Sequence, residues 1–272
     1  MKELAGRKLI LILGIPFGIG CYLIGNPIFA VVTTIVMLGG LDEFYTICEK
    51  KGGHPNRIFG FIITLLIAVS YSGIYAHHQI TIMGIICLSV ISVFFIEIIN
   101  KKEEPLLNIS TTFLGILFVP CLLGTIIYLR QMDHIYNSNV VLALFLSVWF
   151  ADIAAFFFGT KWGKKKIVPM ISPKKSWVGS ISGFSASLLV FILFHELGFL
   201  GARYSLLDSV TFGVISGIFS QLGDFSESLL KRDVGVKDSG NLLRGHGGIL
   251  DRFDSLLFSS SMIYIHFLIF ID

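Results

Sequence analysis

The sequence predicts an all-α integral membrane protein with about nine transmembrane helices. Of its 272 residues, 54% are hydrophobic and 14% are charged, whereas soluble domains carry about 25% charged residues. A soluble globule of this size has too little interior to bury so much apolar surface. The apolar runs are continuous and do not alternate with polar residues, which favours helices over barrel strands. This composition excludes an ordinary soluble enzyme, a disordered chain and a disulfide-knit secreted domain.

Runs without charged residues define the expected spans, because about 20 apolar residues cross a bilayer core. The run 9–41 is divided by the turn signal Gly25-Asn26-Pro27, and the run 58–96 is divided at His77-His78-Gln79. Pro105 precedes the fifth run. The nine predicted helices cover approximately residues 9–24, 27–47, 58–76, 79–98, 106–129, 139–159, 176–195, 206–223 and 253–271.

The distribution of Lys and Arg predicts the orientation, because basic residues collect on the cytoplasmic side of a membrane. With the N-terminus inside, 19 of the 21 basic residues fall inside, and only Arg130 and Arg203 fall outside. The C-terminus is then outside. The expected location is a bacterial cytoplasmic membrane with the polar segments facing the cytoplasm, and nothing in the sequence indicates a nucleic acid partner.

The chain divides into two regions by charge. Residues 1–130 are expected to form about five membrane-embedded helices joined by short turns. Residues 131–272 are expected to form a membrane region that carries the catalytic groups, with two polar cytoplasmic segments at 161–176 and 224–254.

The first polar segment carries six lysines and two prolines within 161–176. Such a segment can be a topology anchor or a patch for anionic lipid. Proline stiffens a loop, however, and a stiff loop with Lys174, Lys175 and Ser176 is suited to hold an anionic group at a set place.

The second polar segment carries acids at two helix ends. If the eighth helix continues inward, Asp224, Glu227 or Ser228, and Lys231 share one face, because residues three, four and seven positions apart lie above one another. Asp251 and Asp254 share a face at the start of the ninth helix. Both helix ends are therefore expected to present carboxylates at one membrane surface. The connecting loop contains Lys237, Asp238, His246 and the glycines Gly235, Gly240, Gly245, Gly247 and Gly248.

These residue types are typical of nucleotidyl or phosphoryl transfer. Mg²⁺ takes one or two carboxylates together with water and substrate phosphates. Glycine-rich turns expose N–H groups to phosphate oxygens, and Lys or Arg neutralises the remaining charge. The alternative is that these charges pair with one another and cap helices.

Asp152 is a separate candidate, because an acid at the centre of a transmembrane helix costs about 2.5–3.5 kcal/mol. It is expected to face a polar cavity, and the alternative is a structural ion pair with a lysine of the following loop. Asp42, Glu43 and Glu97 lie near inner helix ends and are expected to be interfacial residues.

Four motifs resemble the phosphatidate cytidylyltransferase family, also called CDP-diacylglycerol synthases. The longest is Ser228-x-Leu-Lys-Arg-x₄-Lys-Asp-x-Gly-x₂-Leu-x₂-His-Gly-Gly-Ile-x-Asp-Arg-Phe-Asp254. The others are Ser220-Gln-x-Gly-Asp-x-x-Glu-Ser228, Asp152-x-x-Ala-Phe-x-x-Gly-x-x-x-Gly163 and Ser172-Pro-Lys-Lys-Ser176. Together they cover residues 150–254, whereas the first 130 residues resemble the family only as membrane spans.

The resemblance implies the reaction of CTP with phosphatidate to give CDP-diacylglycerol and pyrophosphate, with Mg²⁺ as cofactor and a second cation left open. It also implies a homodimer surrounded by membrane lipids. Asp224 and Asp251 would be metal ligands, with Asp254 and Asp152 as further candidates, and Lys231 and Lys237 would join the two acids as catalytic residues. The implied substrate-binding residues are Lys174, Lys175, Ser176, Ser228, Arg232, Asp238, His246, Gly247, Gly248 and Arg252.

Three residues depart from the family pattern. Arg244 replaces a proline or small residue, Val178 replaces a glutamate of many members, and Phe156 replaces a tyrosine. These departures leave the detail of substrate recognition open. Two other functions are also open: transfer to a different lipid, by a cytidylyltransferase or a lipid kinase, and ion- or proton-coupled transport through Asp152 and Asp224.

Overall fold

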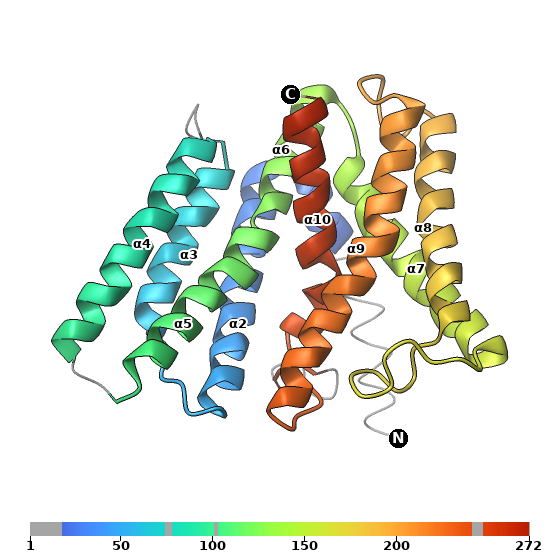
Figure 1. Ribbon diagram of the computed structural model, residues 1–272. Coiled ribbons are helices and arrows are strands. Elements are labelled where there is room, and N and C mark those ends of the chain that lie inside the picture. Colours follow the sequence, from blue (N-terminus) through green and yellow to red (C-terminus); the bar gives the residue numbers. More distant parts are fainter. Residues whose placement is uncertain (1–17, 74–77, 101–102, 241–246, 272) are drawn as a thin grey trace. The chain divides into compact units, whose positions relative to one another are not determined.

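The computed structural model describes residues 18–73, 78–100, 103–240 and 247–271. In these ranges the regular structure is helical, and the only β-type pairing is an isolated bridge between Lys166 and Ser176. The helices, shown in Figure 1, are α2 (Asn26–Glu49), α3 (Arg57–Tyr71), α4 (His78–Asn100), α5 (Pro105–Ile116), the π-helical turn η1 (Leu117–Cys121), α6 (Thr125–Tyr136), α7 (Val140–Trp162), α8 (Trp177–Glu196), α9 (Leu206–Asp233) and α10 (Leu250–Phe270).

The described part of the chain contains seven helices that are long and apolar enough to cross a membrane, so the helical membrane class is confirmed. The predicted count of nine is not confirmed. Residues 18–24 are helical, but the rest of the expected first span lies outside the described residues. The expected span 58–76 is a helix of only 15 residues, which ends before the turn at Ser72 and Gly73.

Two predicted spans are longer in the structure. The span predicted at 106–129 extends to Tyr136, and Pro120 lies within the π-helical turn η1, where proline leaves no N–H for the helical ladder. This extension places Arg130 and Asp133 inside α6, where both side chains are buried. Helix α9 continues ten residues past the predicted end at 223 to Asp233, so residues 224–233 are helix and not loop.

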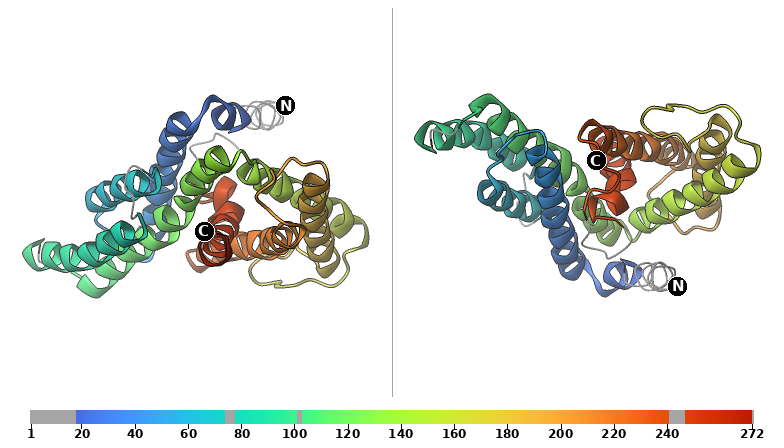
Figure 2. Two further views of the ribbon diagram at one scale, coloured as in Figure 1. Left: turned by 90° about the horizontal axis from the view of Figure 1, so that it is seen from above. Right: turned by 90° about the horizontal axis from the view of Figure 1, so that it is seen from below.

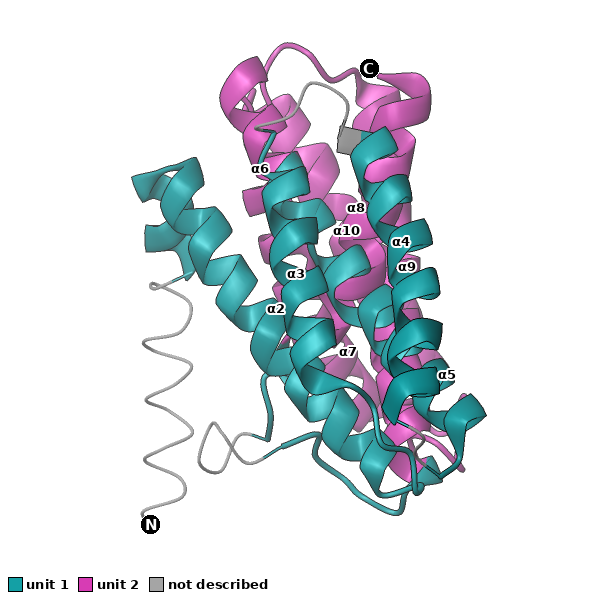
Figure 3. Cartoon of the chain, turned by 90° about the vertical axis from the view of Figure 1, so that its left-hand side faces the viewer, with its two compact units in different colours: residues 1–128, 233–252 teal, residues 129–232, 253–272 magenta. Residues whose placement is uncertain are grey.

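The chain forms two compact units, which Figure 3 distinguishes by colour. Unit 1 consists of Met1–Tyr128 and Asp233–Arg252, and unit 2 consists of Leu129–Arg232 and Phe253–Asp272. In unit 1, Tyr45 of α2 is fully buried and donates a hydrogen bond of 3.0 Å to the carbonyl oxygen of Thr112 in α5. A Cβ at Gly60 or Gly115 would collide with the Tyr45 ring, so glycine at both positions lets these helices pack closely.

In unit 2, small residues bring helix backbones close together, as is common in membrane bundles. Helices α7 and α8 lie side by side (Figure 2). A Cβ at Gly179 would come within 2.7 Å of the Ala155 carbonyl oxygen, and one at Gly183 within 3.0 Å of the Ala151 carbonyl oxygen. A Cβ at Gly223 of α9 would collide with the Asp254 carbonyl oxygen of α10. These contacts hold the helix ends that carry the polar residues.

Replacement of Gly223 by Ala is expected to lower the free energy of unfolding by about 1–3 kcal/mol, the usual cost of overpacking. The obstructing atom belongs to the backbone of α10, so no side-chain rotation can relieve the collision. Thermal unfolding in detergent measures the effect. The matched control is Gly84→Ala in α4, where a Cβ meets no atom within 4 Å. Equal unfolding temperatures for the two variants would contradict the close approach of α9 and α10.

Candidate active site

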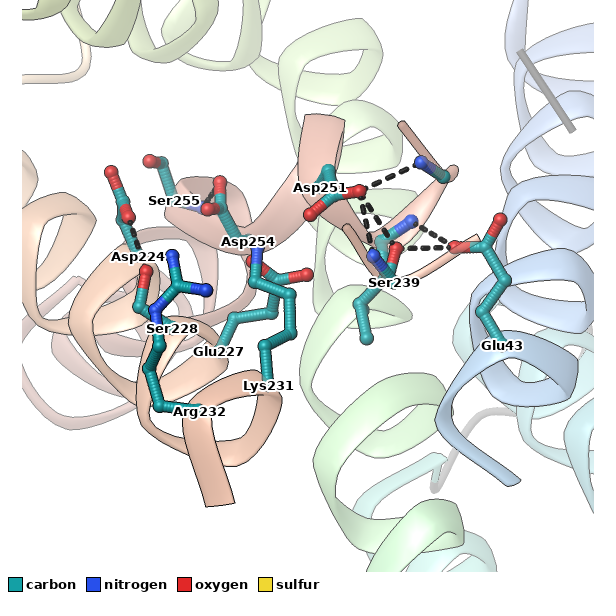
Figure 4. A network of polar contacts seen from close by, with 12 residues as sticks. Glu43, Asp224, Glu227, Ser228, Lys231, Arg232, Ser239, Asp251, Asp254 and Ser255 are labelled. Carbon is teal, nitrogen blue, oxygen red and sulfur yellow. Dashed lines mark hydrogen bonds and ion pairs between the residues drawn. The ribbon is translucent and has the colours of Figure 1, made fainter. Parts of the chain in front are cut away.

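The predicted polar face of α9 is present. Helix α9 carries Asp224, Ser228 and Lys231 in successive turns, and the Ser228 hydroxyl donates to Asp224 Oδ1 at 3.3 Å. Lys231 donates to Glu227, whose side chain is fully buried. Figure 4 shows these side chains along the helix. Lys231, which the resemblance implies is a catalytic residue, therefore forms a buried ion pair with Glu227 in this structure.

Unit 2 contains a cavity of about 250 Å³ between α7, the loop before α8, and the facing parts of α9 and α10. Its walls are mostly apolar. Its polar lining residues include Asp152, Lys174, Lys175, Ser176, Asp224 and Ser255. Three predicted features therefore meet in one cavity: the acid within α7, the lysine-rich loop and the acid of α9.

Lys175 and Asp224 form an ion pair in the wall of this cavity. The side chains are 31% and 30% exposed, respectively, so both charges remain accessible to a ligand. The Lys175 ammonium also lies 4.4 Å from the centre of the Phe225 ring, a cation–π distance. The half-buried Asp254 interacts electrostatically with Asp224, Lys175 and Asp152. The cavity thus brings two carboxylates and the Lys175 ammonium group together, and Asp254 lies within their electrostatic field.

The loop that carries Lys175 has a defined conformation. The Lys165 carbonyl oxygen accepts from the Trp177 N–H at 3.1 Å, and the Lys175 carbonyl oxygen accepts from the Ile167 N–H at 3.2 Å. Ser176 is buried, and its hydroxyl oxygen accepts from the Gly179 N–H at 3.3 Å, so it caps the N-terminus of α8. These hydrogen bonds join the two ends of the loop and attach it to α8 through Ser176, whereas its rigidity stays a prediction.

Sequence reasoning did not single out Ser180 or Gln221, which also line the cavity. The Ser180 hydroxyl donates to Gln221 Oε1, and Gln221 Nε2 donates to the Ser180 carbonyl oxygen at 3.1 Å. This pair joins α8 to α9 beside the ion pair. Gln221 belongs to the Ser220-Gln motif, and this motif could have marked it as a site residue. Its partner Ser180 is 41 residues away, so only the structure shows the pair.

In unit 1, Asp251 lies at the start of α10 and organises the end of the signature loop, the connection 234–249 of which the structure describes 234–240 and 247–249. Its Oδ2 atom accepts from the Gly248 N–H at 2.7 Å, the Ser239 N–H at 2.9 Å and the Ser239 hydroxyl at 3.0 Å (Figure 4). Gly247 has a φ of 79°, a left-handed conformation that favours glycine. The capping alternative therefore describes the contacts of Asp251 in this structure.

Glu43 of α2, which the sequence predicts only as an interfacial residue, contacts the same loop. Its side chain is 6% exposed, and it accepts from the Ser239 hydroxyl at 2.8 Å (Figure 4). It also accepts from the N–H groups of Ile249 and Leu250. No periodicity or motif pointed to this residue, because its partners are about 200 positions away.

The remaining predicted site residues are placed as follows. Asp224 and Asp254 belong to unit 2 and Asp251 to unit 1, so their expected convergence stays a prediction. The described residues include no group of three or more His, Cys, Asp or Glu side chains arranged around one metal position. Arg244 and His246 lie outside the described residues. Lys174, Arg232, Lys237, Asp238 and Arg252 are exposed, as are the departures Phe156 and Val178, and Phe156 also lines the cavity.

These features define a helical membrane protein with a cavity that is lined by carboxylates and lysines. The chain belongs to the cytidylyltransferase family, whose model matches residues 6–270. It is 30% identical to a phosphatidate cytidylyltransferase of Synechocystis sp. over 93% of this chain and 92% of the relative. It is 31% identical to one of Staphylococcus haemolyticus over 95% of this chain and 97% of the relative. A third relative with this name, from Haemophilus influenzae, is 38% identical over 57% of this chain and 55% of its own length.

Proposed function

We propose that this protein transfers the cytidylyl group of CTP to phosphatidate, which yields CDP-diacylglycerol and pyrophosphate. One observation carries the proposal: Lys175 and Asp224, from two separate motifs, meet in one cavity. The family match and the named relatives, two of which align with more than nine tenths of this chain, support the same reaction.

The chemistry suits these groups. A phosphate oxygen of phosphatidate attacks the α-phosphorus of CTP, a new P–O bond forms, and the bond to the β-phosphate breaks to release pyrophosphate. The nucleophile is already an anion, so no strong general base is required. The main obstacle is repulsion between two polyanions, which Lys175 and Lys174 at the cavity can reduce by neutralising phosphate charge.

The donor set of the cavity fits Mg²⁺, which prefers carboxylate oxygen and needs only one or two protein carboxylates beside substrate phosphates. The Lys175 ammonium already pairs with Asp224 and marks where that carboxylate accepts a positive charge. Asp224 would hold the ion, with Asp254 close by and Asp251 as the second predicted ligand. When bound, Mg²⁺ would neutralise phosphate charge and polarise the reacting phosphoryl group. A second cation is left open.

The proposed setting is a bacterial cytoplasmic membrane with the N-terminus and the cavity on the cytoplasmic side. Phe156, Trp162 and Trp177 are exposed near the cavity end of α7 and the start of α8, and aromatic rings of this kind favour the membrane–water boundary. The acyl chains can remain in the bilayer while the phosphate enters the cavity. Assembly as a homodimer is a prediction that follows from the resemblance alone.

The decisive experiment uses purified protein, phosphatidate and two preparations of CTP, one labelled at the α-phosphate and one at the γ-phosphate. Cytidylyl transfer places the α-label in the lipid and the γ-label in pyrophosphate. A lipid kinase would instead place the γ-label in the lipid, and a transporter would leave CTP intact. Either result would overturn the proposal, and a panel of other lipid phosphates as acceptors tests the substrate.

A further inference from the structure

Glu43 carries a buried carboxyl group to which the proposed reaction assigns no role. Both of its carboxyl oxygens accept hydrogen bonds from the start of α10. Oε1 accepts from the Ile249 N–H at 2.8 Å, and Oε2 accepts from the Leu250 N–H at 2.9 Å and from the Ser239 hydroxyl at 2.8 Å. A single side chain of α2 therefore holds both ends of the described signature loop.

Ser239 connects Glu43 to Asp251. Its hydroxyl lies 2.8 Å from Glu43 Oε2 and 3.0 Å from Asp251 Oδ2, and its N–H donates to the same Asp251 oxygen at 2.9 Å. The orientation of the Asp251 carboxyl group thus depends on a segment that Glu43 holds in place. Figure 4 shows the three side chains in sequence from α2 to α10.

The glycines of the signature are explained by the same contacts. A Cβ at Gly248 would collide with the Glu43 carboxyl group and the Ser239 hydroxyl. A Cβ at Gly240 would crowd the Glu43 carboxyl group, and one at Gly247 would collide with Asp251. The loop backbone therefore passes so close to the two acids that no larger residue fits.

We infer that Glu43 is a positioning residue for the reaction: it holds the loop that orients Asp251, so its loss lowers the rate of the chemical step. The inference rests on the proposed function. Glu43 does not touch the reacting atoms. It acts through its hydrogen bonds to Ser239 and to the N-terminus of α10. Displacement of a catalytic group by about 1 Å can cost about 100-fold in rate.

Unit 2 contains a matched control for this arrangement. Asp133 is also buried and accepts from the first two N–H groups of a helix, those of Val140 and Val141, each at 2.8 Å. It also accepts from the hydroxyl of Ser138 at 2.6 Å. This site lies at the start of α7, whereas Asp152 in the cavity is twelve residues further along, about 18 Å at 1.5 Å per residue.

The experiment compares Glu43→Gln with Asp133→Asn, because each change replaces one acceptor oxygen by an amide group that cannot accept. Both variants are expected to have lower unfolding temperatures than the wild type. Only Glu43→Gln is expected to lower kcat per folded molecule, by about tenfold or more, while Asp133→Asn keeps kcat within about twofold of the wild type. The readouts are thermal unfolding, together with kcat and KM for CTP on monodisperse protein.

If Glu43→Gln does not fold, Ser239→Ala and Ser138→Ala form a milder pair, since each removes only one hydroxyl. A loss of kcat in Ser239→Ala alone supports the inference. Equal kcat values within either pair would overturn it and leave Glu43 a structural cap. Wild-type protein that transfers no α-label to phosphatidate would overturn the proposed function and this inference together, so the two failures are distinguishable.

Discussion

Replacement of Asp224 by Asn is expected to lower CTP-dependent turnover by about 100-fold or more, while the protein still inserts into the membrane and purifies. The amide has the shape of the carboxyl group and can still accept the hydrogen bond from Ser228. It loses the charge that pairs with Lys175 and that would bind a cation. A partly exposed ion pair contributes only up to about 1 kcal/mol to stability, so a large loss of turnover would reflect the reaction.

The matched control for Asp224→Asn is Asp233→Asn. Asp233 also forms an ion pair with a lysine, 3.0 Å from Lys51, but both side chains are about half exposed or more. Turnover of this variant is expected to stay within about twofold of the wild type, as for most surface changes. Transfer of the α-label from CTP to phosphatidate provides the measurement for both. Normal turnover in Asp224→Asn would remove this residue from the proposed metal site.

Replacement of Asp251 by Asn is expected to have an effect of similar size, about 100-fold or more on turnover. The amide oxygen can take the place of Oδ2 and accept from Gly248 and Ser239, so the loop keeps its hydrogen bonds. The charge of the predicted metal ligand is lost. Thermal unfolding, measured beside turnover, should show only a small change.

The variant Asp251→Ala separates capping from catalysis. It loses the hydrogen bonds as well as the charge, and loss of a capping side chain costs about 1 kcal/mol of stability. We expect Asp251→Ala to unfold at a lower temperature than Asp251→Asn, with turnover lost in both. If Asp251→Asn retains turnover and only Asp251→Ala loses it, Asp251 is a cap and not a metal ligand.

Two ion pairs of the structure bear on the alternative that the charged residues only pair with one another and cap helices. Lys175 pairs with Asp224 and Lys231 with Glu227, as expected for charges that only satisfy one another. The two pairs differ in burial: Glu227 is fully buried, whereas Lys175 and Asp224 are each about one-third exposed. Breaking the exposed pair costs little, so a phosphate and a cation can replace its two partners. The buried pair is suited to fix α9 in place.

The amino-acid sequence alone determined the helical membrane class, most of the spans and the polar face of α9. Each of these depends on hydropathy or helical periodicity within about 20 neighbouring residues. The predicted helix ends were wrong for α6 and α9, because both helices continue past the apolar run into charged residues, of which Arg130, Asp133, Glu227 and Lys231 are buried in the structure.

Only the tertiary structure decided which distant groups meet. Asp224 pairs with Lys175 in a second motif, and Glu43 bonds to Ser239 and Leu250, 196 and 207 residues away. An acid near a helix end is inexpensive at the membrane boundary, and Glu43 belongs to no recognisable motif, so its sequence neighbours could not reveal that role. Glu43 gains its role from the fold, which buries it against N–H groups that need an acceptor.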